Sequence, residues 1–228
     1  MNPIQKTMDF LKEKQLGETT GHDWWHSERV YQMAMMLCDD SNHVDRRIVA
    51  LAALLHDIED WKFNDGDEMA GPKAARAWLE SLEVETSVID HVTTIIYDLS
   101  YKGTEKKATM KTIEGQIVQD ADRLDALGAI GIARTFAFGA YYGNEIFNPD
   151  IPPRMIIDEA AYKDKTAKST TVNHFYEKLF NLKELMNTEK AKKIAEKRHD
   201  FMVMYMTTFL EEAGYSEGVH NEALAKMV

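Results

Sequence analysis

The stretch AALLHDIEDW, residues 52–61, joins an apolar run to a group of polar side chains without an intervening loop. The apolar run extends from Ile48 to Leu55, and His56 and Asp57 follow it directly. Burial of ionisable groups costs free energy unless they are paired or bound to a metal ion. Adjacent side chains on a helix point about 100° apart, so these two converge only if something lies between them. A divalent cation suits that position, because imidazole nitrogen and carboxylate oxygen are both metal ligands.

For a lone His-Asp pair, the simpler alternative is a helix end at which both side chains reach solvent. Two further segments favour the metal site. HDWWHSERV places His22 and His26 on one helical face, and QDADRLD places Asp122 and Asp125 on one face of an otherwise apolar helix. Three separate helices thus carry histidine or aspartate at or beside their apolar sides, which metal binding explains better than chance.

The segment HDWWH also has the H-x-x-x-H spacing of zinc peptidases, whose helical motif is H-E-x-x-H. Asp23 stands where those enzymes carry the glutamate that serves as general base, and its side chain is one methylene shorter. No third ligand follows in the expected pattern. The peptidase interpretation is therefore the less favoured one.

Helical periodicity dominates the remainder of the chain, and no alternating strand pattern competes with it. We therefore predict an all-α fold, in which residues 1–228 form a single domain and the C-terminal helices, about 169–226, pack on the same core. The predicted helices are a short one before Gly17, segment 23–39, one capped by Asp45 that runs into His56, segments 72–82 and 84–99, one capped by Thr112, a run from Thr171 to Met186, and one capped by Asn187 or Thr188 that ends at Gly214.

The composition and charge of the chain limit the kinds of partner that it is expected to bind. The chain has a formal net charge of −11 and a sequence pI near 5.2, which argues against a nucleic-acid polymer as partner. An anionic small molecule remains compatible, because a bound cation can invert the local field. Cys38 is the single cysteine, so no internal disulfide is possible and a reducing cytoplasm is expected. With no apolar leader and no apolar run of 18 residues, neither a membrane span nor a membrane partner is expected.

In chain order, His26, His56-Asp57 and Asp122 resemble the H…HD…D signature of the HD-domain metal-dependent phosphohydrolases. The segments GHDWWHSERV, ALLHDIEDWKF, LSYKG, IEGQIVQDADRLDALGAIGIARTF and NHFYEKLFNLKELMNT resemble the bacterial YpgQ-like branch and together span nearly the whole chain. The resemblance implies that these four residues bind one divalent cation, whether Mn, Mg, Co, Ni, Fe or Zn. It also implies open positions at that cation for water and substrate.

The resemblance further implies an acidic catalytic residue three positions after the aspartate of the HD pair, which in this chain is Asp60. On a helix, Asp60 would lie one turn from Asp57, where it could orient or deprotonate the attacking water. Glu59 is the nearest alternative, although a regular helix rotates it away. Some relatives carry a glutamate at this position, and the shorter reach of Asp60 leaves the alternative open.

Substrate contacts are expected from three further residues. Lys62 and Lys102 match positions that the branch keeps, and a phosphate needs positive partners besides the metal. The alternative for both is a solvated surface lysine. His22 is expected to contact the substrate or, equally, to donate a hydrogen bond to a metal ligand.

The activity that the resemblance implies is phosphohydrolysis of a nucleotide. Pyrophosphate release from a nucleoside triphosphate is the first choice, and phosphomonoester hydrolysis of the 5′-nucleotidase type is the second. A third interpretation is a metal- and nucleotide-binding sensor with little turnover. The intact ligand set, together with Asp60, favours an enzyme over the sensor.

Overall fold

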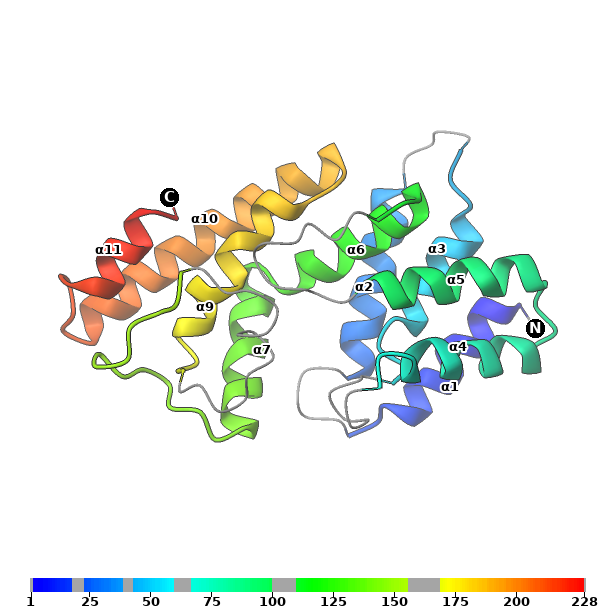
Figure 1. The fold of residues 1–228 in the computed structure, drawn as a ribbon, viewed down its shortest axis with the longest axis horizontal. Helices are drawn as coiled ribbons and strands as arrows, with labels where there is room; N and C mark the ends of the chain where they lie inside the picture. Colours follow the sequence, from blue (N-terminus) through cyan, green and yellow to red (C-terminus); the bar gives the residue numbers. More distant parts are fainter. Residues whose placement is uncertain are drawn as a thin grey trace. The chain divides into compact units, whose positions relative to one another are not determined.

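A computed structural model describes residues 2–17, 23–38, 43–59, 67–99, 110–155 and 169–227. Within these ranges every regular element is a helix and none is a strand, which confirms the predicted all-α class (Figure 1). The chain divides into two compact units, one made of Met1–Tyr101 and Ala108–Asp122, the other of Lys102–Lys107 and Arg123–Val228. The packing of residues 169–226 on one common core stays a prediction. None of the helices in the described ranges combines the length and apolar character needed to cross a membrane.

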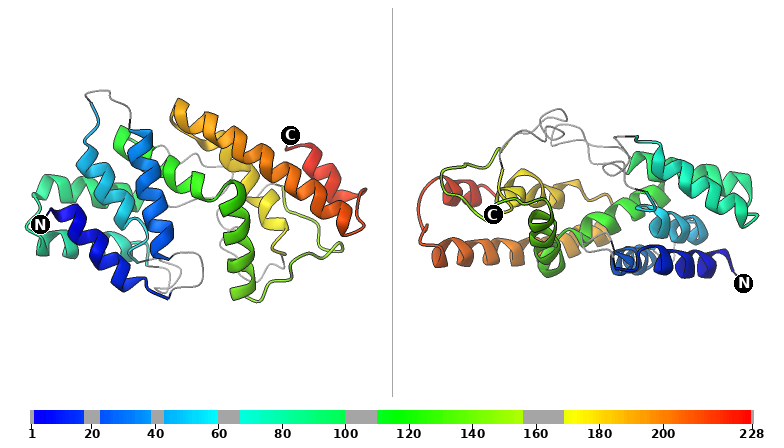
Figure 2. Two further views of the ribbon diagram at one scale, coloured as in Figure 1. Left: turned by 180° about the vertical axis from the view of Figure 1, so that it is seen from behind. Right: turned by 90° about the horizontal axis from the view of Figure 1, so that it is seen from below.

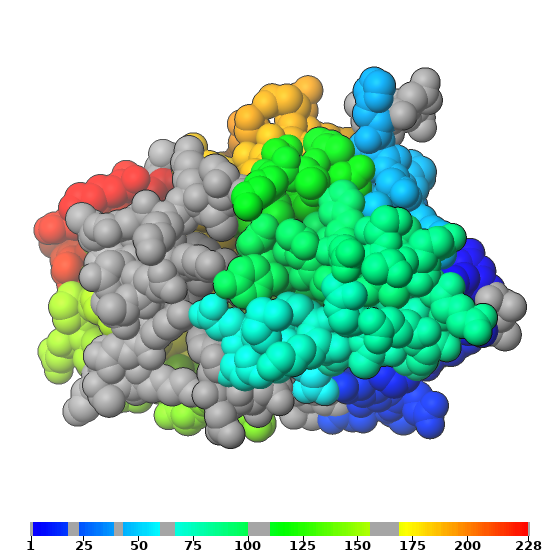
Figure 3. Space-filling view, turned by 45° about the vertical axis from the view of Figure 1, so that its right-hand side comes forward, coloured from blue at the N-terminus to red at the C-terminus, as the bar shows by residue number. Residues whose placement is uncertain are grey.

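The first unit is organised around its third helix, α3, which packs against α1, α2 and α5 (Figure 2). A second contact joins α5 to α4, and these two helices lie at the surface of the unit in Figure 3. Its helices are α1 (Pro3–Lys14), α2 (Trp24–Leu37), α3 (Arg46–Leu55), α4 (Ala70–Ser81), α5 (Thr86–Asp98) and all but the last turn of α6 (Ile113–Asp125).

The central position of α3 follows from its sequence. Asp45 begins the helix, and its carboxylate accepts the backbone N–H groups of Arg47 and Ile48 at 2.9 and 3.3 Å. Every residue from Ile48 to Leu55 is at most 7% exposed. Full burial of a valine, leucine or isoleucine side chain contributes roughly 1.5–3 kcal/mol. The predicted cap and the predicted buried run are therefore both confirmed, and the apolar run carries the residues that follow it toward the interior of the unit.

The second unit is built along the long helix α10, which packs against α7, α11 and a 3₁₀ segment, η2. Its elements are α7 (Gly128–Tyr141), α9 (Asn173–Glu177), η2 (Leu179–Leu185), α10 (Glu189–Glu212) and α11 (Val219–Ala225). The hydroxyl of Thr188 accepts the N–H of Ala191 at 3.3 Å, so Thr188 is the cap of α10. A Cβ atom at Gly139 would lie 2.2 Å from Thr171 Oγ1, so glycine permits a close approach of the chain to α7 at this point.

The apolar run from Thr171 to Met186 differs from the regular helix that its periodicity indicates. The α-helix ends at Glu177, and the dihedral angles of Lys178 (φ −139°, ψ −57°) lie outside the helical region. The chain continues as a 3₁₀ helix, in which residues three apart share one face. Leu179 and Leu182 occupy such a face and are almost fully buried. The 3₁₀ helix therefore buries apolar residues that lie three apart in the sequence, a spacing that fits a helix of 3.6 residues per turn less well.

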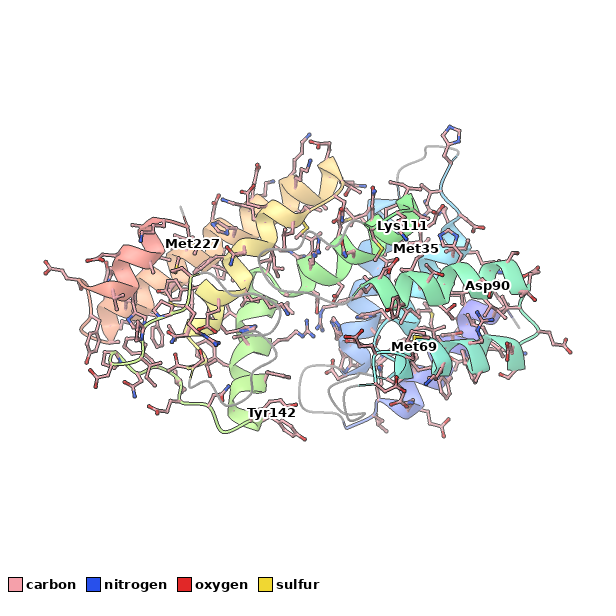
Figure 4. The ribbon with its side chains drawn as sticks, in the orientation of Figure 1. Met35, Met69, Asp90, Lys111, Tyr142 and Met227 are labelled. Carbon is pink, nitrogen blue, oxygen red and sulfur yellow. The ribbon has the colours of Figure 1, made fainter. Side chains whose placement is uncertain are left out.

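Two buried histidines are expected to make the second unit sensitive to acid. Burial lowers the pKa of both His199 and His220. The Nε2–H of His199 donates to the backbone oxygen of Met227, a residue labelled in Figure 4, at 2.7 Å. His220 Nε2 lies 3.3 Å from Asn173 Oδ1. The unfolded chain therefore binds protons near the ordinary pKa of about 6.5, whereas the folded chain binds them only at lower pH. We expect the free energy of unfolding to fall as the pH falls below that value.

The measurement is denaturant unfolding between pH 7.5 and 5, followed for the wild type, for a His199→Gln/His220→Gln variant, and for His43→Gln, which alters an exposed histidine. The double variant should lose less stability on acidification than the wild type, and His43→Gln should not differ from it. Equal pH dependence in all three proteins would contradict the expectation.

Candidate metal centre

In the first unit, two histidine side chains lie close together, and two aspartate carboxylates lie near both of them. The first turn of α2 supplies His26, the residues directly after α3 supply His56 and Asp57, and α6 supplies Asp122. The Nε2 atoms of His26 and His56 lie 3.1 Å apart. Asp57 Oδ2 lies 3.3 and 3.4 Å from these nitrogens, and Asp122 Oδ1 lies 3.7 and 3.6 Å from them. The structure thus brings together the four residues that the resemblance implies as ligands.

A helix cap at the start of α2 positions His26. The carboxylate of Asp23 accepts the N–H of His26 at 2.9 Å, which satisfies one of the unpaired donors at the start of α2. Asp23 therefore has the role of an N-cap, in contrast to the general base that the peptidase interpretation requires at this position. The cap fixes the backbone from which the buried imidazole of His26, only 1% exposed, reaches the centre.

The ring of His56 is oriented by the helix that precedes it. Its Nδ1 lies 2.8 Å from the carbonyl oxygen of Ala53. A carbonyl only accepts, so Nδ1 carries the hydrogen and the lone pair of neutral His56 lies on Nε2. That lone pair faces the other three donors. A hydrogen bond from the second ring nitrogen to a backbone carbonyl is the usual way in which proteins fix a metal-binding histidine.

Comparison with known proteins identifies the family to which the chain belongs. Residues 24–127 match the family model of the HD domain, a range that includes all four converging residues. The uncharacterised protein YpgQ of Bacillus subtilis is 36% identical over 190 residues, which cover 83% of each chain. The chain belongs to the HD-domain superfamily. Its members are metal-dependent phosphohydrolases, and HD domains bind divalent metal ions.

Several solved structures share this fold. An HD-superfamily hydrolase of Bacillus thuringiensis is 43% identical, with a TM-score of 0.68 over 92% of this chain and 96% of its own. A Lactobacillus plantarum protein is 30% identical, with a TM-score of 0.79 over 93% and 97% of the two chains. Bacillus subtilis YpgQ in complex with ADP is 31% identical in this comparison, with a TM-score of 0.70 over 92% and 97%.

The geometry of the HD residues fits a divalent cation. Nitrogen and oxygen ligands lie about 2.0–2.2 Å from such an ion, so neighbouring donors are about 3.0 Å apart around an octahedral ion and about 3.4 Å apart around a tetrahedral one. The observed separations between the histidine nitrogens and the other donors run from 3.1 to 3.7 Å. The two carboxylates also balance the charge of a divalent cation when both histidines are neutral. Donor set, spacing and charge are therefore all compatible with one ion.

Electrostatic coupling between the histidines and the aspartates is also compatible with a bound cation. Burial lowers the pKa of His56, but the carboxylates of Asp57 and Asp122 raise it by more, and it stands well above its ordinary value. Burial raises the pKa of Asp122, but the hydrogen bond and the charge of His56 lower it by more, to about 2. The carboxylates thus attract positive charge to the lone pair of His56. A metal ion and a proton compete for that lone pair.

The remaining candidate residues fall into two groups. Asp60, Lys62, Lys102 and His22 lie outside the described residues, and their roles stay predictions. Glu59, the alternative to Asp60, is described: its Oε1 lies 2.5 Å from Lys14 Nζ of α1, and both side chains are about one-third exposed. This ion pair joins the Glu59 carboxylate to α1.

Two contributions to the centre come from groups that no sequence pattern marks. One is the backbone oxygen of Ala53, which any residue at that position would supply. The other is Gly71 in the first turn of α4. A Cβ atom there would lie 3.0 Å from the backbone oxygen of Glu59, so glycine lets α4 pack directly against the segment that follows His56 and Asp57. Neither could be found from residue type and spacing alone.

Proposed function

We propose that this HD-domain protein is a nucleotide phosphohydrolase that uses one divalent cation held by His26, His56, Asp57 and Asp122. The single observation that carries the proposal is the position of the two histidine nitrogens, 3.1 Å apart, each with a carboxylate oxygen of Asp57 and of Asp122 at 3.3–3.7 Å. A divalent cation bound there would polarise a phosphoryl oxygen and favour ionisation of the attacking water. The residues of the chain then have to bind the phosphates and accept the water proton.

Asp60 is the residue proposed to accept that proton, and Lys62 and Lys102 are proposed to bind phosphate oxygens. Support for Asp60 comes from its position three residues after Asp57 and from the pairing of the competing Glu59 with Lys14. His22 is proposed to contact the substrate or to orient a metal ligand. These assignments rest on the sequence resemblance and on spacing along the chain.

A nucleoside triphosphate is the proposed substrate, with water adding at phosphorus and pyrophosphate leaving with the bond electrons. The products are a nucleoside monophosphate and pyrophosphate. The ADP complex of Bacillus subtilis YpgQ, a relative that aligns over most of the chain, supports a nucleotide ligand. The acidic overall charge of this chain is compatible with that anionic ligand only if a cation or local basic groups offset it.

A substrate panel tests the proposal. Nucleoside tri-, di- and monophosphates are incubated with Mn²⁺, Co²⁺, Ni²⁺ or Mg²⁺, and phosphate, pyrophosphate and nucleoside products are quantified separately. We expect triphosphates to yield monophosphate and pyrophosphate in equal amounts, and a chelator to abolish the reaction. In ¹⁸O-labelled water the label should enter the monophosphate if water attacks the α-phosphorus.

Other outcomes separate the competing functions. Phosphate release from monophosphates, without pyrophosphate from triphosphates, would replace the proposal by a phosphomonoesterase. Tight nucleotide binding with no turnover under any of the four metals would replace it by a sensor.

A further inference from the structure

A buried carboxylate far along the chain from the metal ligands joins the two helices that deliver three of them. Glu114 lies in the first turn of α6 and is 7% exposed. Its Oε1 accepts the backbone N–H of Asp45 at 3.0 Å. Asp45 is itself the N-cap of α3. One carboxylate thus bridges the N-terminal ends of α3 and α6.

The second oxygen of Glu114 faces a third helix. His91 of α5 has its Nε2 3.8 Å from Glu114 Oε2 and 3.0 Å from Thr112 Oγ1. Thr112 Oγ1 also accepts the N–H of Gly115 at 3.2 Å, as the predicted cap of α6 should. The start of α6, which Lys111 precedes in Figure 4, is therefore tied to both α3 and α5.

The position of this bridge relates it to the metal centre. His56 follows Asp45 by 11 residues along α3 and Asp122 follows Glu114 by eight along α6. At 1.5 Å per residue, these spans correspond to roughly 16 and 12 Å of helix. Two helices that are joined at their starts carry ligands at or near their ends. A shift or rotation at the bridge therefore changes the separation of His56 and Asp57 from Asp122.

Charge adds to the hydrogen bond. The N-terminal end of a helix carries a partial positive charge, and an acidic side chain there is stabilising. Glu114 lies in the first turn of α6 and accepts a hydrogen bond from the residue that begins α3, so this one side chain contacts the start of both helices. A replacement would need a buried acceptor that reaches the N–H of Asp45.

We propose that Glu114 is a positioning residue for the metal centre, which sets the spacing between His56-Asp57 and Asp122 by bridging the starts of α3 and α6. The inference rests on the proposed function, because it assumes that these residues bind a cation. It assigns to Glu114 an effect on metal affinity and coordination geometry, although Glu114 contributes no ligand.

The test compares Glu114→Ala and Glu114→Gln with Glu177→Gln. Glu177 is a matched control: it is 5% exposed, accepts hydrogen bonds from Arg154 at 2.9 and 3.0 Å, and lies in the second unit, which supplies none of the four ligands. The readouts are the dissociation constant for Co²⁺, from competition with a chelator, and the visible absorption spectrum of the Co²⁺-loaded protein, which reports coordination geometry.

Glu114→Ala should weaken Co²⁺ binding about 10-fold or more and alter the spectrum, as is typical when residues that orient metal ligands are replaced. Glu114→Gln keeps an acceptor oxygen, so its Co²⁺ affinity and spectrum should lie between those of the wild type and Glu114→Ala. The glutamine variant also tests the inference if the alanine variant fails to fold. Glu177→Gln should lose thermal stability while keeping wild-type affinity and spectrum. Wild-type affinity and spectrum in Glu114→Gln, together with wild-type affinity in any folded Glu114→Ala, would overturn the inference. Absence of Co²⁺ binding by the wild type would instead overturn the proposed function.

Discussion

Replacement of His56 by alanine is expected to abolish metal binding and hydrolysis together. His56 lies within 3.1–3.6 Å of the donor atoms of the other three residues, and its ring is already oriented by Ala53. Its loss removes a nitrogen ligand and leaves two carboxylates with one imidazole. Changes outside the ligand shell typically cost about 10–100-fold in affinity, so loss of a ligand should cost more than about 100-fold. The corresponding alanine variants of His26, Asp57 and Asp122 should behave alike.

The measurement is metal content after dialysis, together with turnover under saturating metal. His43→Ala is the control, because it removes an exposed histidine of the same unit and should keep both properties. A His56→Ala protein that retains both stoichiometric metal and activity would show that the cation lies elsewhere. Retained metal with lost activity would assign His56 to catalysis and remove it from the ligand set.

The second large effect separates Asp60 from the ligands. Asp60→Asn should keep the metal and much of the substrate affinity, yet lower kcat by ~10²–10⁴-fold, the usual cost of removing a positioned acid–base group. Asp57→Asn should instead weaken metal binding, because a neutral amide is a poorer ligand for a divalent ion than a carboxylate. Glu59→Gln should be far milder, since Glu59 is engaged with Lys14 at 2.5 Å.

Metal content and kcat are measured for all three variants at saturating metal. A near-normal kcat in Asp60→Asn, or a severe loss in Glu59→Gln, would move the proton transfer to the other carboxylate. If Asp60→Asn lost the metal as well, Asp60 would belong to the ligand set.

The sequence predicts those parts of the fold that are determined by residues close together along the chain. The run from Ile48 to Leu55, with its cap at Asp45, is such a part, because an uninterrupted apolar helical segment is most stable when it is buried. Asp23 shows the limit of local information. The same residue is compatible with a catalytic base or with a helix cap, and only its contact with the N–H of His26 separates the two.

Features that depend on distant partners could not be predicted from spacing. Glu114 resembles an ordinary acidic residue in the first turn of a helix. Its partner, the backbone N–H of Asp45, lies 69 residues away along the chain, and every residue other than proline offers a donor of this kind. The 3₁₀ turn after Lys178 is a second case, because apolar residues at positions such as Leu179 and Leu182 fit either helix type until packing selects one. Histidine and aspartate beside the apolar sides of three helices already indicate a metal site, but the particular set of four residues was predictable only through the resemblance, which supplies the missing long-range information.

The most direct test of the central claim is a crystal structure of the protein loaded with Mn²⁺ or Co²⁺, with the ion located by anomalous scattering. We expect one strong peak in the first unit, about 2.0–2.3 Å from Nε2 of His26 and His56 and from a carboxylate oxygen each of Asp57 and Asp122. His56 Nδ1 should also donate to the oxygen of Ala53, at a distance near the 2.8 Å described above. A cation bound elsewhere, or bound here with one of the four side chains turned away, would contradict the claim.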